Sequence, residues 1–170
     1  YINKFGFGKK TGVDLNGESS GILFSLDKVG PVELATMSFG QSFQITPLQM
    51  LRAASAIING GNLVTPHFAV KSVSEADGTA VEFNYEIQSN AIEEKTSLMM
   101  KDILRQVVEE GGGKKAYLEG FSIGGKTATS QKLPRGSGKY ISSFIGFSPV
   151  DNAKVIAMCL IDEPQGIYYG

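Results

Sequence analysis

The apolar residues that follow Thr46 recur every three or four positions, which is the spacing of one face of a helix. Thr46 can cap this helix, Pro47 suits its first position, and Gln49 completes a capping box. The run Asn59-Gly60-Gly61 then ends the pattern. The sequence therefore predicts a helix that begins at Thr46-Pro47 and stops before residue 59.

A second helical pattern extends from about Glu93 to Glu110 and ends at the three glycines 111–113. A shorter helix is predicted at Val32–Phe39, directly before Gly40. The long helix is expected to bury a stripe made of Met99, Met100, Ile103, Leu104, Val107 and Val108.

The period changes after the second helix, and the remaining apolar runs are typical of β-strands. Turn signals at residues 134–138 and 151–152 separate them, so the pattern predicts an antiparallel meander. Residues 1–31 are rich in glycine and polar groups and are expected to form an ordered loop. The predicted strands are 121–132, 140–149 and 154–162, with shorter candidates at 63–64 and 68–73 before a turn at 75–79.

Composition indicates one globular domain of ordinary size: 170 residues, 42% hydrophobic and 19% charged. The net charge of −1 argues against a general nucleic-acid-binding protein, which needs a basic surplus to neutralise phosphates. The lone Cys159 lies in the apolar run VIAMCLI, where we expect a buried, inert thiol. Asp162 and Glu163 are expected to be surface charges, and Lys132–Lys139 a solvated hairpin tip.

The segment GFSIGGKTATSQ, residues 120–131, matches by its letters the phosphate-binding loop G-x-x-x-x-G-K-T. Such a loop needs a buried strand before its first glycine and a helix that begins at the Lys-Thr pair. Here the preceding residues are KKAYLEG, and Pro134 with two further glycines follows soon after. Residues 126–132 alternate as a strand does, so the nucleotide-binding interpretation is disfavoured.

Several blocks in a fixed order give the chain a resemblance to the class B penicillin-binding transpeptidases. The resemblance covers nearly the whole chain and implies an α/β fold, the penicillin-binding transpeptidase (serine β-lactamase-like) fold, with antiparallel central strands and covering helices. The blocks are FGFGKKTGVDLNGE (5–18), ATMSFGQSFQITPLQMLRAASAIINGG (35–61), TPHF (65–68), VVEEGGGKKAYLEGFSIGGKTATSQK (107–132) and SSFIGFSPVDNAKVIAMCLIDEP (142–164).

The resemblance also implies roles for one short segment. The third family motif, Lys-Thr/Ser-Gly, maps onto Lys126-Thr127-Ala128, followed by Thr129. Lys126 and the Thr127 hydroxyl would bind the carboxylate of a D-Ala-D-Ala stem peptide. Thr129 would offer its backbone amide to the oxyanion of the tetrahedral intermediate. Ala128 departs from the family's glycine, and we expect its methyl group to be tolerated.

Two of the three family motifs, the Ser-x-x-Lys nucleophile and Ser-x-Asn, have no convincing counterpart, so the catalytic nucleophile is absent from this chain. Ser25-Leu26-Asp27-Lys28 fits the first by letters but lies in the glycine-rich loop. Lys10-Thr11-Gly12 copies the third motif, and we expect a turn there. His67 is expected to pack at the start of a strand.

The resemblance thus implies that residues 1–170 are the C-terminal part of one transpeptidase domain that also contains an upstream half. The implied partners are the stem peptide, β-lactams, that missing half, and proteins of division, elongation or sporulation, with no nucleic acid, metal or other cofactor. The implied location is the outer face of the cell membrane, with an anchoring helix outside this chain. A D,D-carboxypeptidase and a non-catalytic penicillin-binding-like module remain as alternatives.

Overall fold

The computed structural model describes residues 1–134 and 136–170, and for Leu26 it describes the backbone alone. The chain divides into two compact units. The first contains Tyr1–Ala56 and Gly61–Glu93, and the second contains Ile57–Gly60 and Glu94–Gly170. Both contain helices and antiparallel β-structure.

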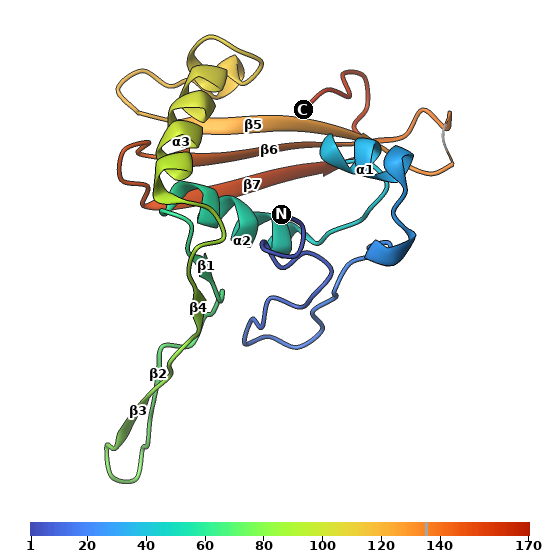
Figure 1. The fold of residues 1–170 in the computed structure, drawn as a ribbon. Helices are drawn as coiled ribbons and strands as arrows, with labels where there is room; N and C mark the ends of the chain where they lie inside the picture. Colours follow the sequence, from blue (N-terminus) through green and yellow to red (C-terminus); the bar gives the residue numbers. More distant parts are fainter. Residues whose placement is uncertain (135) are drawn as a thin grey trace. The chain divides into compact units, whose positions relative to one another are not determined.

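The first unit consists of loops, short helices and two small ladders (Figure 1). Strand β1 pairs with β4, and β2 pairs with β3 as a hairpin. The turn at 75–79 and the strands at β1 and β2 were predicted, whereas β3 and β4 were missed. The elements are η1 (Leu26–Lys28), α1 (Pro31–Ser38), α2 (Pro47–Ile58, whose last two residues belong to the second unit), β1 (Leu63–Val64), β2 (Lys71–Val73), β3 (Ala80–Glu82) and β4 (Ile87–Gln88).

The capping box predicted for α2 is confirmed. The Gln49 backbone N–H donates to Thr46 Oγ1 at 3.1 Å, and the Thr46 N–H donates to Gln49 Oε1 at 2.9 Å. The Gln49 amide also donates to the carbonyls of Lys9 at 2.6 Å and Ser20 at 2.9 Å. The side chain is 2% exposed, so one buried glutamine both starts the helix and fastens the N-terminal loop to it.

The second unit is a three-stranded antiparallel sheet with a long helix, α3 (Glu94–Glu109) (Figure 1). The strands are β5 (Gly124–Gln131), β6 (Tyr140–Ser148) and β7 (Val155–Asp162), in the order β5-β6-β7. A short helix, η2 (Lys114–Ala116), lies between α3 and β5. The predicted meander is therefore confirmed, and β5 forms one edge of the sheet.

The core of the second unit forms between the sheet and apolar side chains from the helical segments. Phe147 and Val150 are 4% exposed and pack with Ile58, which is 8% exposed. The partly buried Leu104 of α3 packs against this cluster. Ser97 is also buried, and its hydroxyl donates to the Ile57 carbonyl at 2.6 Å and accepts from the Gly60 N–H at 3.1 Å.

Two burial predictions for the second unit were wrong. Met99 and Ile103 are 58% and 49% exposed, whereas the other members of the predicted stripe are buried or partly buried. The covered side of α3 runs through Ser97, Leu104 and Val108. Cys159 is exposed because it lies on an open face of β7, where it lines an apolar groove with Phe144 and other sheet residues. Among the described residues, no helix combines the length and apolar character that a membrane crossing needs.

Candidate active site

The segment 126–129 lies in the middle of β5, at the edge of the sheet. Lys126 is opposite Ile145, Thr127 opposite Phe144, Ala128 opposite Ser143, and Thr129 opposite Ser142. The prediction of a strand here is confirmed. The phosphate-loop interpretation is wrong, because no helix begins at Lys126-Thr127 to direct its amides at a phosphate.

Hydrogen bonding at the end of the ladder shows which backbone groups of β5 face outward. The Lys132 N–H donates to the Lys139 carbonyl at 2.9 Å, in continuation of the β5–β6 register. Antiparallel ladders alternate, so the even-numbered residues of β5 bond to β6 and the odd-numbered ones point away from it. The N–H and C=O groups of Thr127 and Thr129 therefore face the open edge, which no described strand pairs.

The side chains of the segment divide between the two faces of the sheet. Lys126 and Ala128 stand on one face, and Thr127 and Thr129 on the other. Lys126 is exposed, and its Nζ donates to the Thr127 carbonyl at 2.7 Å, so its ammonium group lies at the open edge. Ala128 is also exposed.

Two glycines that precede Lys126 are needed for close packing. A Cβ on Gly124 would come within 2.4 Å of the Phe147 ring, and a Cβ on Gly125 within 2.5 Å of the Phe144 ring. Both distances are far below van der Waals contact. The G-G-K letters therefore reflect two phenylalanine rings that lie on opposite faces of the sheet and press against the start of β5.

Comparison with known proteins identifies this arrangement. The model of the penicillin binding protein transpeptidase domain matches residues 1–170. The chain belongs to the penicillin-binding transpeptidase family. The family predicted from the sequence blocks is therefore confirmed.

Individual transpeptidase relatives resemble the whole chain. Stage V sporulation protein D of Bacillus subtilis is 44% identical over 170 residues, covering 98% of this chain and 26% of that protein. The probable peptidoglycan D,D-transpeptidase PenA of Neisseria meningitidis is 32% identical over 175 residues, covering 100% of this chain and 28% of that protein. The chain thus spans about a quarter of the length of these curated relatives.

A solved transpeptidase structure agrees with the fold. Penicillin binding protein 3 of Mycobacterium tuberculosis, complexed with aztreonam, has a TM-score of 0.88 and 30% identity to this chain. The match covers 96% of this chain and 39% of that one. The α/β transpeptidase fold predicted from the sequence is confirmed.

The letter matches to other family motifs have structural roles instead. The Ser25 hydroxyl donates to Asp27 within the turn at η1, and the Lys28 N–H donates to the Ser25 carbonyl. Thr11 is 4% exposed and donates through both its N–H and its hydroxyl to Glu18 Oε1, each at 2.6 Å. Ser25 thus lies in a local turn, and Thr11 is buried and bound to Glu18.

The only histidine, His67, also has a packing role. Its ring stacks on Tyr85 with centroids 3.9 Å apart, and its Nδ1 lies 2.9 Å from the Thr65 carbonyl oxygen. Within the described residues, no group of three or more His, Cys, Asp or Glu side chains is arranged to hold a metal ion.

The structure also brings to β5 and β6 some residues that the sequence did not single out. The Gly170 N–H donates to Thr129 Oγ1 at 3.0 Å, and the Ser142 hydroxyl donates to the Tyr168 carbonyl. We call residues 164–170 the C-terminal segment. It has no periodic pattern, so no sequence signal indicated that it returns to β5.

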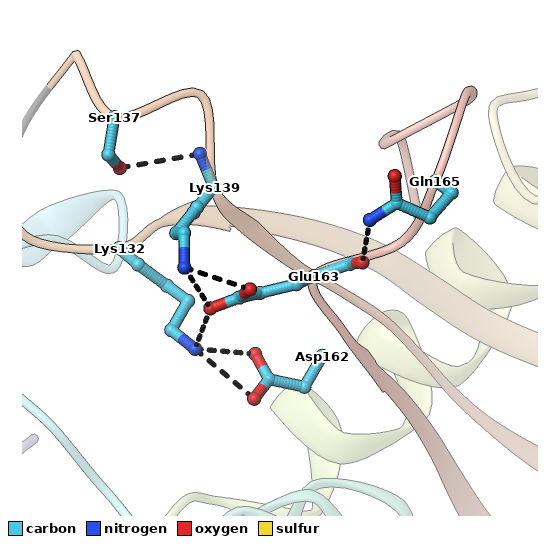
Figure 2. A network of polar contacts seen from close by, with 6 residues as sticks. All are labelled: Lys132, Ser137, Lys139, Asp162, Glu163 and Gln165. Atoms are coloured by element: carbon cyan, nitrogen blue, oxygen red, sulfur yellow. Dashed lines mark hydrogen bonds and ion pairs between the residues drawn. The ribbon is translucent and has the colours of Figure 1, made fainter.

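A cluster of charges lies at the end of the sheet from which this segment departs (Figure 2). Lys132 Nζ lies 2.8 Å from Glu163 Oε1 and 2.9 Å from Asp162 Oδ1. Lys139 Nζ lies 3.1 Å from Glu163 Oε2. Hydrogen bonds from Lys132 and then Lys139 lower the pKa of Glu163, and those acidic partners raise the pKa of Lys132. Residues predicted to be surface charges and a solvated hairpin tip thus form one network.

Proposed function

We propose that this chain is the substrate-binding part of a peptidoglycan D,D-transpeptidase, an enzyme that cross-links stem peptides ending in D-Ala-D-Ala. The observation that carries the proposal is the open edge of β5, where a cationic side chain and two outward-facing threonine backbones lie within four residues. A peptide with a free carboxylate fits such an edge, because it can add as a strand and end against the lysine.

Each residue of the segment has a role that its geometry supports. Lys126 binds the terminal carboxylate of the substrate through a charge-assisted hydrogen bond, and the Thr127 hydroxyl supplies a second donor. The Thr129 N–H, which points away from β6, stabilises the oxyanion of the tetrahedral intermediate. Ala128 places only a methyl group beside them. The roles of Lys126, Thr127, Ala128 and Thr129 are part of this proposal.

The reaction needs a nucleophile from another part of the protein. We propose that residues 1–170 form the C-terminal part of a transpeptidase domain whose Ser-x-x-Lys and Ser-x-Asn motifs lie in a preceding segment. That serine attacks the carbonyl of the penultimate D-Ala, the terminal D-Ala leaves, and an amine of a neighbouring stem peptide then resolves the acyl-enzyme. A β-lactam acylates the same serine; aztreonam and ampicillin are bound in structures of a relative.

The names of the relatives support a proposal about where the protein acts. They are named as peptidoglycan transpeptidases and as a sporulation protein. We propose that this protein acts outside the cytoplasmic membrane and is attached to it by an anchor that this chain does not contain. Its expected partners are the cell-wall peptide and proteins of division, elongation or sporulation.

The test is acylation of the full-length protein by a fluorescent penicillin, followed by product analysis with a D-Ala-D-Ala stem peptide. We expect the wild type to be labelled and to form cross-linked peptide. Replacing Lys126 with Gln should slow acylation by about 10- to 100-fold, the value of one hydrogen bond to a charged group. The matched control is Lys154→Gln, at another exposed lysine of the same unit, which should acylate at the wild-type rate.

The outcomes separate the candidate functions. Labelled protein that only releases D-Ala to water would identify a carboxypeptidase. Labelled protein that neither cross-links nor hydrolyses the peptide would identify a penicillin-binding module without turnover. Equal acylation of the Lys126 and Lys154 variants would contradict the role of the β5 edge.

A further inference from the structure

The charge network joins the two sides of the turn between β5 and β6 to the end of β7. The Glu163 carboxylate lies between the ammonium groups of Lys132 and Lys139, which flank the turn between β5 and β6 (Figure 2). Asp162, the last residue of β7, adds a second carboxylate to Lys132. The network therefore fixes the end of β7 to the ends of both other strands.

Glu163 is also the point where the backbone turns out of the sheet. Its φ of 51° is in the left-handed region, which side chains other than glycine rarely adopt. Its N–H donates to the Tyr140 carbonyl at 2.9 Å, and its carbonyl accepts from the Gln165 side chain at 3.2 Å. Contacts on both the backbone and the side chain thus hold a disfavoured turn in place.

The C-terminal segment that starts at this turn comes back to the proposed substrate strand. The Tyr168 ring stacks on Tyr140 with centroids 4.3 Å apart, and the Tyr168 carbonyl accepts from the Ser142 hydroxyl. The Gly170 N–H then donates to Thr129 Oγ1. Ser142 and Thr129 are directly opposite each other, so the segment lies on one face of the sheet across β6 and β5.

We propose that Glu163 is a positioning residue for the substrate strand. Its ion pairs with Lys132 and Lys139 set the path of the C-terminal segment, and that segment holds the Thr129 side chain through Gly170. Because Thr129 Oγ1 accepts the Gly170 amide, the hydroxyl proton of Thr129 is directed elsewhere. The effect on catalysis rests on the proposed function. The attachment of residues 164–170 to the sheet through Glu163, which we call the tether, does not.

Two measurements on the full-length protein test the two parts of the proposal. The first is hydrogen exchange of peptides that cover residues 164–170, which reports the tether directly. The second is the rate of acylation by a fluorescent penicillin, resolved into the limiting rate and the apparent binding constant. The variants are Glu163→Gln and Lys132→Met, with Lys132→Arg as the conservative change and Glu110→Gln as the matched control at an exposed glutamate.

We expect Glu163→Gln and Lys132→Met to speed exchange in residues 164–170 by about 2- to 5-fold, the value of exposed ion pairs. The limiting acylation rate should fall by a similar factor, whereas the apparent binding constant should change less, because the charge on Lys126 is untouched. Lys132→Arg and Glu110→Gln should match the wild type. Added salt should slow acylation of the wild type toward the rate of the Glu163→Gln variant.

A further variant, Glu163→Gly, separates the carboxylate from the backbone. Glycine removes the charge but tolerates the left-handed turn, so we expect exchange at least as fast as in Glu163→Gln. Exchange at the wild-type rate in Glu163→Gly or Glu163→Gln would overturn the tether. Faster exchange with unchanged acylation would overturn the positioning role. An unlabelled wild type would instead refute the proposed function, and exchange would still decide the tether.

Discussion

The packing at the start of β5 leads to a specific prediction for Gly125. A Cβ at this position would lie 2.5 Å from the Phe144 ring and 2.7 Å from the Ile145 carbonyl oxygen. The ring can shift, but the carbonyl belongs to the neighbouring strand, so relief requires β5 to move away from β6. We therefore expect Gly125→Ala to disturb the strand that carries Lys126.

The magnitude follows from the cost of overpacking. Inserting a methyl group into a well-packed site costs about 1–3 kcal/mol, which exceeds the gain of about 0.4–1 kcal/mol from replacing a glycine in the unfolded chain. Subtracting that gain leaves a net loss of up to about 2.6 kcal/mol, which corresponds to a fall in Tm of up to about 10 °C at about 2–4 °C per kcal/mol. The matched control is Gly112→Ala, where the nearest atom, Thr127 Oγ1, is 3.9 Å from the added Cβ and the φ is not left-handed.

The assay is thermal unfolding of the full-length protein with and without a bound penicillin, which identifies the transition of the transpeptidase domain by its shift. Gly125→Ala should lower this Tm and slow acylation, and Gly112→Ala should leave the Tm close to the wild-type value. Equal Tm values for the two variants would refute the packing explanation of the glycine pair.

Two further predictions concern the first unit. Replacing the buried Gln49 with Leu removes the donors to the Lys9 and Ser20 carbonyls, which should destabilise the protein by about 1–3 kcal/mol. The same change at the exposed Gln88 should be nearly neutral. Equal unfolding curves for the two variants would contradict this prediction. Hydrogen bonds from the Ser74 side chain and then the Thr79 backbone lower the pKa of Asp77 to about 2. Because this folded-state pKa is below the ordinary value, the carboxylate stabilises the hairpin turn above about pH 4, and the effect is lost as the pH falls toward 2. The amide NMR shift of Thr79 should titrate in that window and should lose the response in Asp77→Asn; a midpoint near 3.8 would count against the hydrogen bonds.

Local patterns were sufficient to predict much of the fold. The capping box at Thr46 and Gln49 depends on residues three positions apart, and it forms as predicted. The three long strands follow from alternation and from the turns between them. The burial of α3 was predicted less well, because periodicity identifies an apolar side but does not show which part of it another element covers. Met99 and Ile103 are accordingly exposed.

The candidate site, too, was predicted in part from local sequence and in part depends on tertiary contacts. The residue types and order around Lys126 identified the strand and its family, and the resemblance supplied the roles of the side chains. The alternation that turns the Thr129 N–H toward the open edge depends on the pairing of Lys132 with Lys139, which no local pattern specifies. The role of Gly125 depends likewise on a ring that is 19 residues further along the chain.

By itself, the sequence determined the α-helices, the three long antiparallel strands and the membership of the penicillin-binding transpeptidase family, because each depends on neighbouring residues or on motifs in order. Only the tertiary structure decided that residues 164–170 return to β5 and that Glu163 joins Lys132 to Lys139. These contacts come from irregular backbone and from charges brought together by folding, and neither has a period that can be read along the chain.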